Sequence, residues 1–230
     1  MMSIIYSDMI KMITQYLEEK DIKSLKKVSK YNNSVITLIH VRNIKVSRNN
    51  QYILLYNEKS LSNIRIIHIN DVSYSILPTM TNVEEIYADH TCVSLIPNLL
   101  KLKILHCKSC WIYKLPEILP NLEDLNCFYN ERISYIPPYE KLKKLCCAYN
   151  KRIIALPFFP DLEELDCECT DIEFLEQYPK LRILNCKKTR ISELPRLEHL
   201  EKLHCDIVFA DDADLKIKFP KLKYLNYYRV

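Results

Sequence analysis

Six cysteines with almost constant spacing are the first candidates for chemistry, because thiolates bind metals and attack electrophiles. They recur every 19 or 20 residues, as Cys107, Cys127, Cys147, Cys167, Cys186 and Cys205. If each lies on its own parallel strand, the sulfurs form a line with a spacing of about 4.8 Å. Tetrahedral zinc needs four ligands that converge at about 2.3 Å, which a line does not provide. We therefore expect small apolar core residues and no metal; a disulfide between neighbouring strands is geometrically conceivable, but a reducing compartment argues against it.

The other cysteines and histidines form weaker constellations. Cys107 and Cys110 make a single CxxC pair, which predicts neither redox chemistry nor a metal site without a second pair. His106, His204 and Cys146 share one place in their repeats, but His106 and Cys146 would lie two strands, or about 10 Å, apart. The chain contains no glycine, which excludes a P-loop, a dinucleotide fingerprint and a nucleophile elbow. We expect a binding protein rather than an enzyme, with no catalytic residues, no cofactor and no small-molecule substrate.

Charge and hydropathy limit the possible partners. The formal net charge is +4, but residues 1–60 hold ten Lys or Arg against five acidic residues, which leaves 23 against 24 in the rest of the chain. A nearly neutral region argues against a nucleic-acid groove. Ser7, Asp8 and Lys11 interrupt the first residues before an export signal can form, and no apolar stretch is long enough to span a bilayer. We expect a soluble cytoplasmic protein with no nucleic-acid or membrane partner.

An internal repeat dominates the chain. Each unit begins with LxxLxC or a conservative variant, continues with an apolar residue, and in its clearest examples ends in Leu-Pro or Ile-Pro. Successive units are 19, 19, 20, 20, 20, 19, 19 and 22 residues apart, and they begin at Ile64, Val83, Leu102, Leu122, Leu142, Leu162, Leu181, Leu200 and Leu222. A weaker match begins at Val41, with Ile44 and Val46. Positions within a unit are counted from its first residue.

This pattern resembles the leucine-rich-repeat family, in which LxxLxC forms a short parallel strand with its first, fourth and sixth side chains in a continuous core. The resemblance implies an α/β solenoid over residues 41–230, with about nine repeats that are clearest from residue 64 to residue 230. A period of 19 to 22 residues leaves no room for a full helix, so we expect Pro-rich, helix-poor returns. The family's ninth-position Asn is kept only at Asn130 and Asn150, which predicts less regular turns at Thr91, Cys110, Thr170 and Thr189.

Residues 1–40 predict a small three-helix segment that caps the solenoid. Ser7 and Asp21 can cap helices whose apolar residues follow helical spacing. The order of residues resembles the F-box: Ile5, Asp8, Met9-Ile10, Ile13, Tyr16-Leu17, Asp21-Ile22, Leu25 and Val28-Ser29-Lys30. It departs from that pattern at two places. Tyr6 stands where the F-box has Pro, and Tyr31 or Asn32 stands where the F-box has an aromatic residue that is often Trp. A cap without any adaptor is the simpler alternative, because a repeat protein needs its terminal core covered.

An F-box followed by leucine-rich repeats is a known domain pairing, and the resemblance implies a substrate-recruiting subunit of a cullin-RING ubiquitin ligase. The helices would bind the Skp-family adaptor, through contacts that include Met9, Ile10, Ile13, Leu17, Leu25 and Val28, while the solenoid holds an unknown protein substrate. Similar pairs occur in eukaryotes and in large DNA viruses, where the protein would act in the host cytoplasm. The alternative is a leucine-rich-repeat scaffold or decoy that binds a protein partner without any ubiquitin-ligase role.

Two rows of side chains are candidates for contact with a partner. The third, fifth and seventh positions should line the concave face, and the residues we select there are His106, Asp124, Asn126, Phe128, Glu164, Asp166 and Glu168. We expect Phe128 to be an exposed hot spot and the three acidic residues at 164–168 to attract a basic segment. The second position alternates in charge without exception: Arg65, Glu84, Lys103, Glu123, Lys143, Glu163, Arg182, Glu201 and Lys223. We expect this row to stabilise the register through lateral ion pairs rather than to bind the partner.

Overall fold

A computed structural model describes residues 42–47, 62–72, 76–206 and 212–227 of the 230-residue chain. The predicted three-helix segment at residues 1–40 lies outside these ranges. Its six expected adaptor contacts, from Met9 to Val28, therefore lie outside them too.

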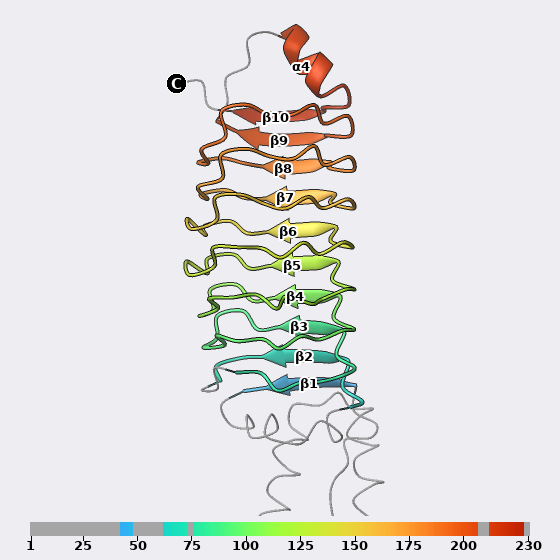
Figure 1. The fold of residues 1–230 in the computed structure, drawn as a ribbon, viewed down its shortest axis with the longest axis vertical. Coiled ribbons are helices and arrows are strands. Elements are labelled where there is room, and N and C mark those ends of the chain that lie inside the picture. Colours follow the sequence, from blue (N-terminus) through green and yellow to red (C-terminus); the bar gives the residue numbers. More distant parts are fainter. Residues whose placement is uncertain (1–41, 48–61, 73–75, 207–211, 228–230) are drawn as a thin grey trace, which may run out of the picture.

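The described residues form a parallel β-solenoid with very little helix (Figure 1). Its strands pair in sequence order to make one sheet, β1-β2-β3-β4-β5-β6-β7-β8-β9-β10. They are β1 (Asn43–Val46), β2 (Ile66–Ile69), β3 (Glu85–Tyr87), β4 (Ile104–His106), β5 (Asp124–Asn126), β6 (Lys144–Cys146), β7 (Glu164–Asp166), β8 (Ile183–Asn185), β9 (Lys202–Cys205) and β10 (Tyr224–Tyr227). The weak match at Val41 is a genuine unit, because β1 pairs with β2 in the same register as the later strands.

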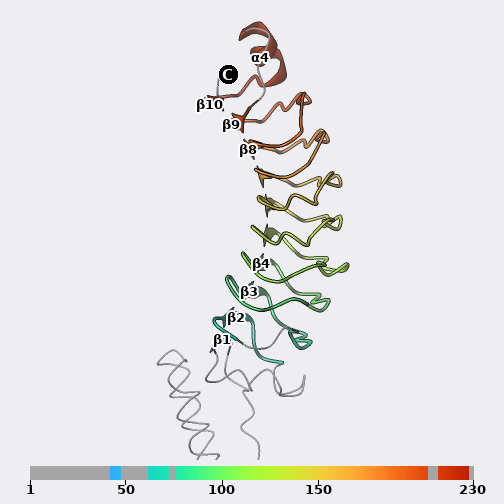
Figure 2. The same ribbon diagram turned by 90° about the vertical axis from the view of Figure 1, so that its left-hand side faces the viewer.

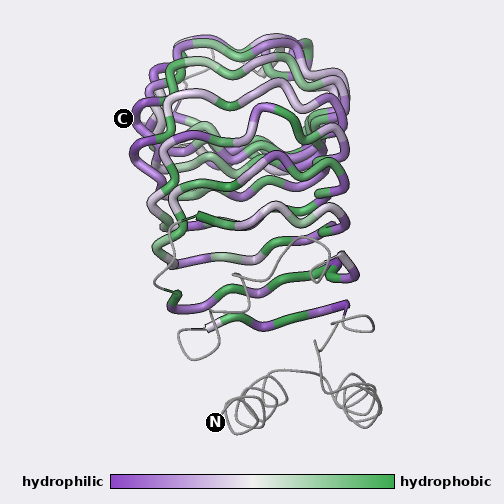
Figure 3. The backbone as a smooth tube through the Cα atoms, turned by 60° about the horizontal axis from the view of Figure 1, so that its bottom comes forward, coloured by the Kyte–Doolittle hydropathy of each residue, from purple (hydrophilic) through white to green (hydrophobic). Residues whose placement is uncertain are grey.

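The spacing of apolar residues places the core. In the unit that begins at Leu102, the first, fourth and sixth side chains are Leu102, Leu105 and Cys107, and none of the three is exposed to solvent. Such turns bury their apolar faces only against their neighbours, so one core runs the length of the solenoid. Hydrophobic and hydrophilic residues alternate along the strands, as expected when one face is buried (Figure 3).

The cysteine column lies in this core, as predicted. All six sixth-position cysteines are buried, and all ten cysteines of the chain are free thiols. Burial raises the pKa of the Cys107, Cys147 and Cys167 thiols well above its ordinary value, because a thiolate would be desolvated there. The column therefore consists of neutral, close-packed side chains.

The return segments are extended rather than helical, which confirms the prediction from the repeat length. Their apolar residues complete the core; Ile112 and Leu115 are examples, both at most 2% exposed. Within the described ranges the one helix is α4 (Asp212–Lys218), which occupies the longer 22-residue unit between β9 and β10. The solenoid itself is thus a β structure, so the expected α/β class overstates the helical content. No helix in the described part of the chain is long and apolar enough to cross a membrane.

The turns that follow β2 to β8 each have a left-handed residue at the eighth position. Seven non-glycine residues have φ between 44° and 60°: Asp71, His90, Ser109, Tyr129, Tyr149, Cys169 and Lys188. The backbone N–H groups of five of them, from His90 to Cys169, continue the backbone pairing between turns; the Ser109 amide, for example, donates to the Phe128 carbonyl at 2.8 Å. The Lys188 amide donates instead to the Asp206 side chain at 2.6 Å. The expected irregularity at turns without Asn is therefore not found at this position.

The ninth side chain closes the turn from inside. Asn130 Nδ2 donates to the carbonyls of Cys107 and Cys127, at 2.8 and 3.0 Å, and so bonds to its own turn and the preceding one. A threonine bonds only to the carbonyl of its own turn, as Thr91 Oγ1 does to the Ala88 carbonyl at 2.8 Å, although Thr91 Oγ1 also lies 3.4 Å from Cys110 Sγ in the next turn. Replacing Asn by Thr therefore loses the bond to a carbonyl of the preceding turn but keeps the turn itself.

We predict that Ser109→Gly raises the free energy of unfolding by up to about 1 kcal/mol, because an L-residue with a side chain is strained at positive φ and glycine is not. The matched control is Ser134→Gly, at an exposed residue of an extended return, where glycine only adds freedom to the unfolded chain. Urea denaturation of both variants checks this. Equal destabilisation by the two substitutions would contradict it.

Candidate binding surface on the concave sheet

The strands lie on an arc, with their solvent-facing sheet surface on the concave side and the turns and returns behind it (Figure 2). Side chains at the third and fifth positions face this side. Strand register aligns them in rows, so that His106 pairs with Asn126, Asn126 with Cys146, and Cys146 with Asp166. Together these rows form the concave surface of the solenoid.

A shallow cavity of about 360 Å³ lies on this surface. Five of the seven residues selected from the sequence line it, namely His106, Asp124, Asn126, Glu164 and Asp166. Phe128 and Glu168 are seventh-position residues and do not line it. The structure adds Lys144, Cys146, Ile183, Asn185 and His204, which the same two columns in neighbouring units identify once the register is known.

Phe128 is partly buried rather than exposed, so the expectation of an exposed ring is wrong. Its ring centroid lies 5.1 Å from that of Tyr149 and 6.2 Å from that of Tyr129. Aromatic pairs at these separations attract one another beyond the area they bury. Phe128 therefore packs in an aromatic cluster where the strands end.

The acidic residues do not form an unpaired acidic patch. Lys144 Nζ forms an ion pair with Glu164 Oε1 at 2.7 Å, and Lys188 Nζ forms one with Glu168 Oε1 at 3.1 Å. Lateral neighbours thus neutralise both charges within the chain. A partner would meet a surface of mixed charge rather than one that selects a basic segment.

Asp166 differs from these two glutamates, because its contacts in the described part of the chain are to uncharged donors. Its Oδ1 accepts the Glu168 backbone N–H at 3.2 Å, and its Oδ2 accepts the Cys146 thiol at 3.8 Å. Burial raises the pKa of this carboxyl, and the charge of Glu168 adds to the rise. The folded structure therefore destabilises the ionised form of Asp166 relative to the protonated form.

The arrangement of His106 and Cys146 does not resemble a nucleophile and its base. Asn126 on β5 separates them, and His106 Nε2 lies 3.2 Å from Asp124 Oδ1 instead. Burial and the nearby Asp166 raise the pKa of Cys146 to about 11, which disfavours the thiolate that nucleophilic attack needs. In the ranges that the structure describes, no group of three or more His, Cys, Asp or Glu side chains is arranged to hold a metal ion.

The second-position row forms three clusters of ion pairs next to the sheet. Lys103 and Arg65 flank Glu84 at 2.8 and 3.7 Å. The Lys143 ammonium lies 2.7 Å from Glu123. Arg182 and Lys223 flank Glu201, at 2.9 and 2.8 Å, and their hydrogen bonds lower the pKa of Glu201 to about 2. Alternation of charge therefore produces lateral pairs at five of the eight steps between neighbouring units.

No protein-family model matches this chain, and no curated protein matches it in sequence. Its function must therefore be inferred from the repeat architecture and from the chemistry of its own surfaces.

We predict that Lys143→Glu lowers the melting temperature, because it places three carboxylates side by side at Glu123, residue 143 and Glu163. It should leave partner binding intact, since this row lies outside the concave cavity. Lys151→Glu, at an exposed residue of a turn away from this row, makes the same change of charge without that neighbourhood. Melting curves followed by circular dichroism check the difference, and an unchanged curve for Lys143→Glu would count against the row as a stabilising feature.

We predict that the contribution of Asp166 to the free energy of unfolding falls as the pH rises, because the pKa of its carboxyl is raised in the folded state. The folded state holds the proton more tightly than the unfolded chain, so the cost of ionising Asp166 is absent below the unfolded pKa of about 4 and complete above the folded pKa. Asp166→Asn should therefore gain in unfolding free energy relative to the native chain as the pH rises through this window.

Asp161→Asn provides a control of opposite sign. Lys180 lies 2.6 Å from Asp161 and lowers its pKa, so the native aspartate stabilises the fold above the unfolded pKa and loses this effect as the pH falls. This variant should lose stability relative to the native chain as the pH rises. Parallel trends for the two variants would show that burial of Asp166 is not the cause.

Proposed function

We propose that this chain is a leucine-rich-repeat protein that binds another protein on its concave sheet, and that residues 1–40 recruit it as an F-box to a cullin-RING ubiquitin ligase. The observation that carries the binding role is the cavity of about 360 Å³ on the solvent face of a continuous parallel sheet, lined by side chains of both charges. Curved repeat surfaces of this kind suit extended contact with a protein partner.

Two features support the leucine-rich-repeat assignment beyond the sequence pattern. The LxxLxC segments coincide with the strands and bury the positions that the family buries. Asn130 and Asn150 lie inside the turns and donate to carbonyl groups of two successive units, the part that the ninth-position Asn plays in that family.

A protein is a better fit to the concave surface than a small molecule. The cavity is shallow, spans β4 to β9, and offers hydrogen-bonding groups at Asn126, Lys144 and Asn185 along its length. Small-molecule sites instead bury most of the ligand in a mainly apolar cavity. Paired charges such as Lys144 and Glu164 can exchange their partners for groups on an incoming chain, which favours specificity more than affinity.

The ubiquitin-ligase role rests on residues 1–40 and their likeness to the F-box. An F-box joined to leucine-rich repeats brings a captured protein to the Skp-family adaptor, and the solenoid itself performs no chemistry. The protein would act in the cytoplasm, or in the host cytoplasm if it is viral. A solenoid that binds its partner without an adaptor would be a scaffold or decoy.

We predict that reversing two concave charges abolishes partner capture. Asp124→Arg with Lys144→Glu keeps the net charge but inverts the cavity at two adjacent strands. Lys114→Glu with Glu117→Lys inverts an exposed ion pair whose charged atoms are 3.1 Å apart, at residues that do not line the cavity, and serves as control. Cross-linked partners of each full-length variant are compared by mass spectrometry in extracts of cells that make the protein.

The concave variant should lose the specific partners by about tenfold or more, as expected for a site with central contacts. The control should keep them, and both variants should keep adaptor binding. The same partners on all three proteins would place the binding surface elsewhere.

We predict that the full chain captures the Skp-family adaptor in a pull-down and that a chain without residues 1–40 does not. Circular dichroism must show that the shortened chain still forms its β structure. Capture by the full chain alone supports the ligase role. If neither folded protein captures the adaptor, the chain is a scaffold or decoy and residues 1–40 are a structural cap.

A further inference from the structure

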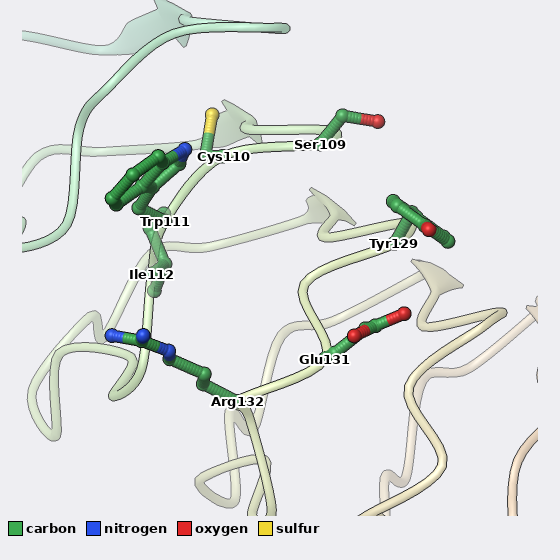
Figure 4. Close-up of a pocket in the computed structure, with 7 residues that line it drawn as sticks. All are labelled: Ser109, Cys110, Trp111, Ile112, Tyr129, Glu131 and Arg132. Atoms are coloured by element: carbon green, nitrogen blue, oxygen red, sulfur yellow. The ribbon is translucent and has the colours of Figure 1, made fainter.

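A second cavity, of about 300 Å³, lies among the turns that follow β4 and β5 (Figure 4). It is lined by Ser109, Cys110, Trp111, Ile112, Tyr129, Glu131 and Arg132. None of these residues lines the concave cavity. It is therefore a separate surface, and binding at this cavity is independent of the proposed function.

The cavity arises where the turns change length. The apolar residue after the ninth position is Ile112 in one unit, two residues beyond Cys110, and Ile133 in the next unit, three residues beyond Asn130. The longer turn closes on itself, because the Ile133 amide donates to the Asn130 carbonyl at 2.9 Å. The neighbouring turns therefore cannot pair along this stretch.

One result is an unused backbone acceptor at the cavity. The carbonyls of Val93, Ile153 and Ile172 each accept an N–H from the next turn, at 3.0, 3.1 and 2.9 Å. Ile112 and Ile133 are the equivalent residues in the two units that a longer turn follows, and no backbone N–H of the described chain bonds to either carbonyl; of these two residues, Ile112 alone lines the cavity. An incoming peptide N–H could supply the missing bond.

The same change leaves a buried side-chain atom without a donor. Asn150 Oδ1 accepts the Asn130 amide at 2.6 Å, which is the bond between two long turns. Asn130 Oδ1 faces a short turn in the preceding unit and has no hydrogen-bond partner among the described residues. Two polar groups at this junction thus have no donor among the described residues, and the Ile112 carbonyl is the one whose residue lines the cavity.

The side chains around the opening suit contact with protein. Trp111 is 64% exposed and Tyr129 48% exposed, and they lie on opposite sides of the opening, with Arg132 below Trp111 and Glu131 below Tyr129 (Figure 4). Tryptophan, tyrosine and arginine are the residues most enriched in interface hot spots. Such large exposed rings lose little conformational freedom when they are covered.

The charges at the cavity decide what kind of group it takes. Glu131 and Arg132 are both exposed and opposite in sign, so the lining selects neither a cation nor an anion. The Arg132 guanidinium and the Glu131 carboxylate point away from one another (Figure 4), so they can bond to different peptide groups of an extended segment, the guanidinium to a C=O and the carboxylate to an N–H. The two aromatic rings favour a third ring, because aromatic pairs attract beyond their buried area.

We propose that this cavity binds an extended segment of another protein by an aromatic side chain of that segment. The ring contacts Trp111 and Tyr129, and the adjoining peptide groups bond to Glu131, Arg132 and the Ile112 carbonyl. The volume of about 300 Å³ is at the lower end for ligand sites, and it suits one large side chain rather than a folded surface.

Trp111 is the single tryptophan of the chain, so its fluorescence reports on this site alone. A phage-displayed random peptide library is selected on the full-length protein and counter-selected on the Trp111→Ala variant. The recovered sequences are made as synthetic peptides without tryptophan and titrated against the full-length protein, with excitation selective for tryptophan. Labelled peptides are also titrated by fluorescence polarisation against Tyr129→Asn, Arg132→Ala and Asp166→Asn variants.

We expect peptides that share an aromatic residue and that shift the Trp111 emission as they bind. Tyr129→Asn removes a ring while keeping a residue that tolerates positive φ, and it should weaken binding by about tenfold or more, as should Arg132→Ala. Asp166→Asn, on the concave surface, should leave binding unchanged.

Three results would overturn the proposal. One is that no peptide is recovered against the native surface. Another is a set of peptides that share basic or acidic residues but no aromatic residue. The third is binding that neither moves the Trp111 emission nor weakens in the Tyr129→Asn variant.

Discussion

Every turn of this solenoid buries its apolar residues against the turns on either side and has no core of its own. Leu105, for example, lies between Ile86 and Leu125 in the strand register, and all three side chains are buried. Parallel register is what brings these side chains together, because a slip of one residue would turn each strand's apolar face outward. The cysteine column, the closed turns and the shape of both surfaces all depend on this stacking.

Stacking also determines what the concave surface can recognise. It sets equivalent residues side by side at the strand spacing, so that Lys144 meets Glu164, and it brings His106 within 3.2 Å of Asp124 on the neighbouring strand. Glu164 and Glu168, which look like an acidic patch in one unit, are therefore neutralised by the units on either side. The surface that remains is mixed in charge, with the half-buried Asp166 as an acidic group whose pKa is raised, and it suits a partner that forms specific polar contacts.

The turns show how a chain without glycine makes a regular solenoid. Left-handed residues occupy the same position in seven turns, and in six of these turns an Asn, Thr or Cys side chain at the ninth position donates to carbonyl groups inside the solenoid. Each such residue carries some backbone strain, which the hydrogen bonds to both neighbouring turns offset. Beyond the ninth position, the backbone bonding between turns stops where the next turn is a longer one that closes on itself, and the second cavity opens at one such place, beside Trp111 and Tyr129.

The sequence by itself determined the repeat, its parallel strands, the buried cysteines and the helix-poor returns. These follow from a period of about 20 residues and from local alternation, which act within a single unit. The same alternation was the basis for selecting seven concave residues, and five of the seven line one cavity. Only the tertiary structure decided that Phe128 packs against Tyr149 and that Glu164 and Glu168 are already paired, because those contacts join different units. It also decided where the second cavity lies, since that depends on the mismatch between two successive turns rather than on either turn alone.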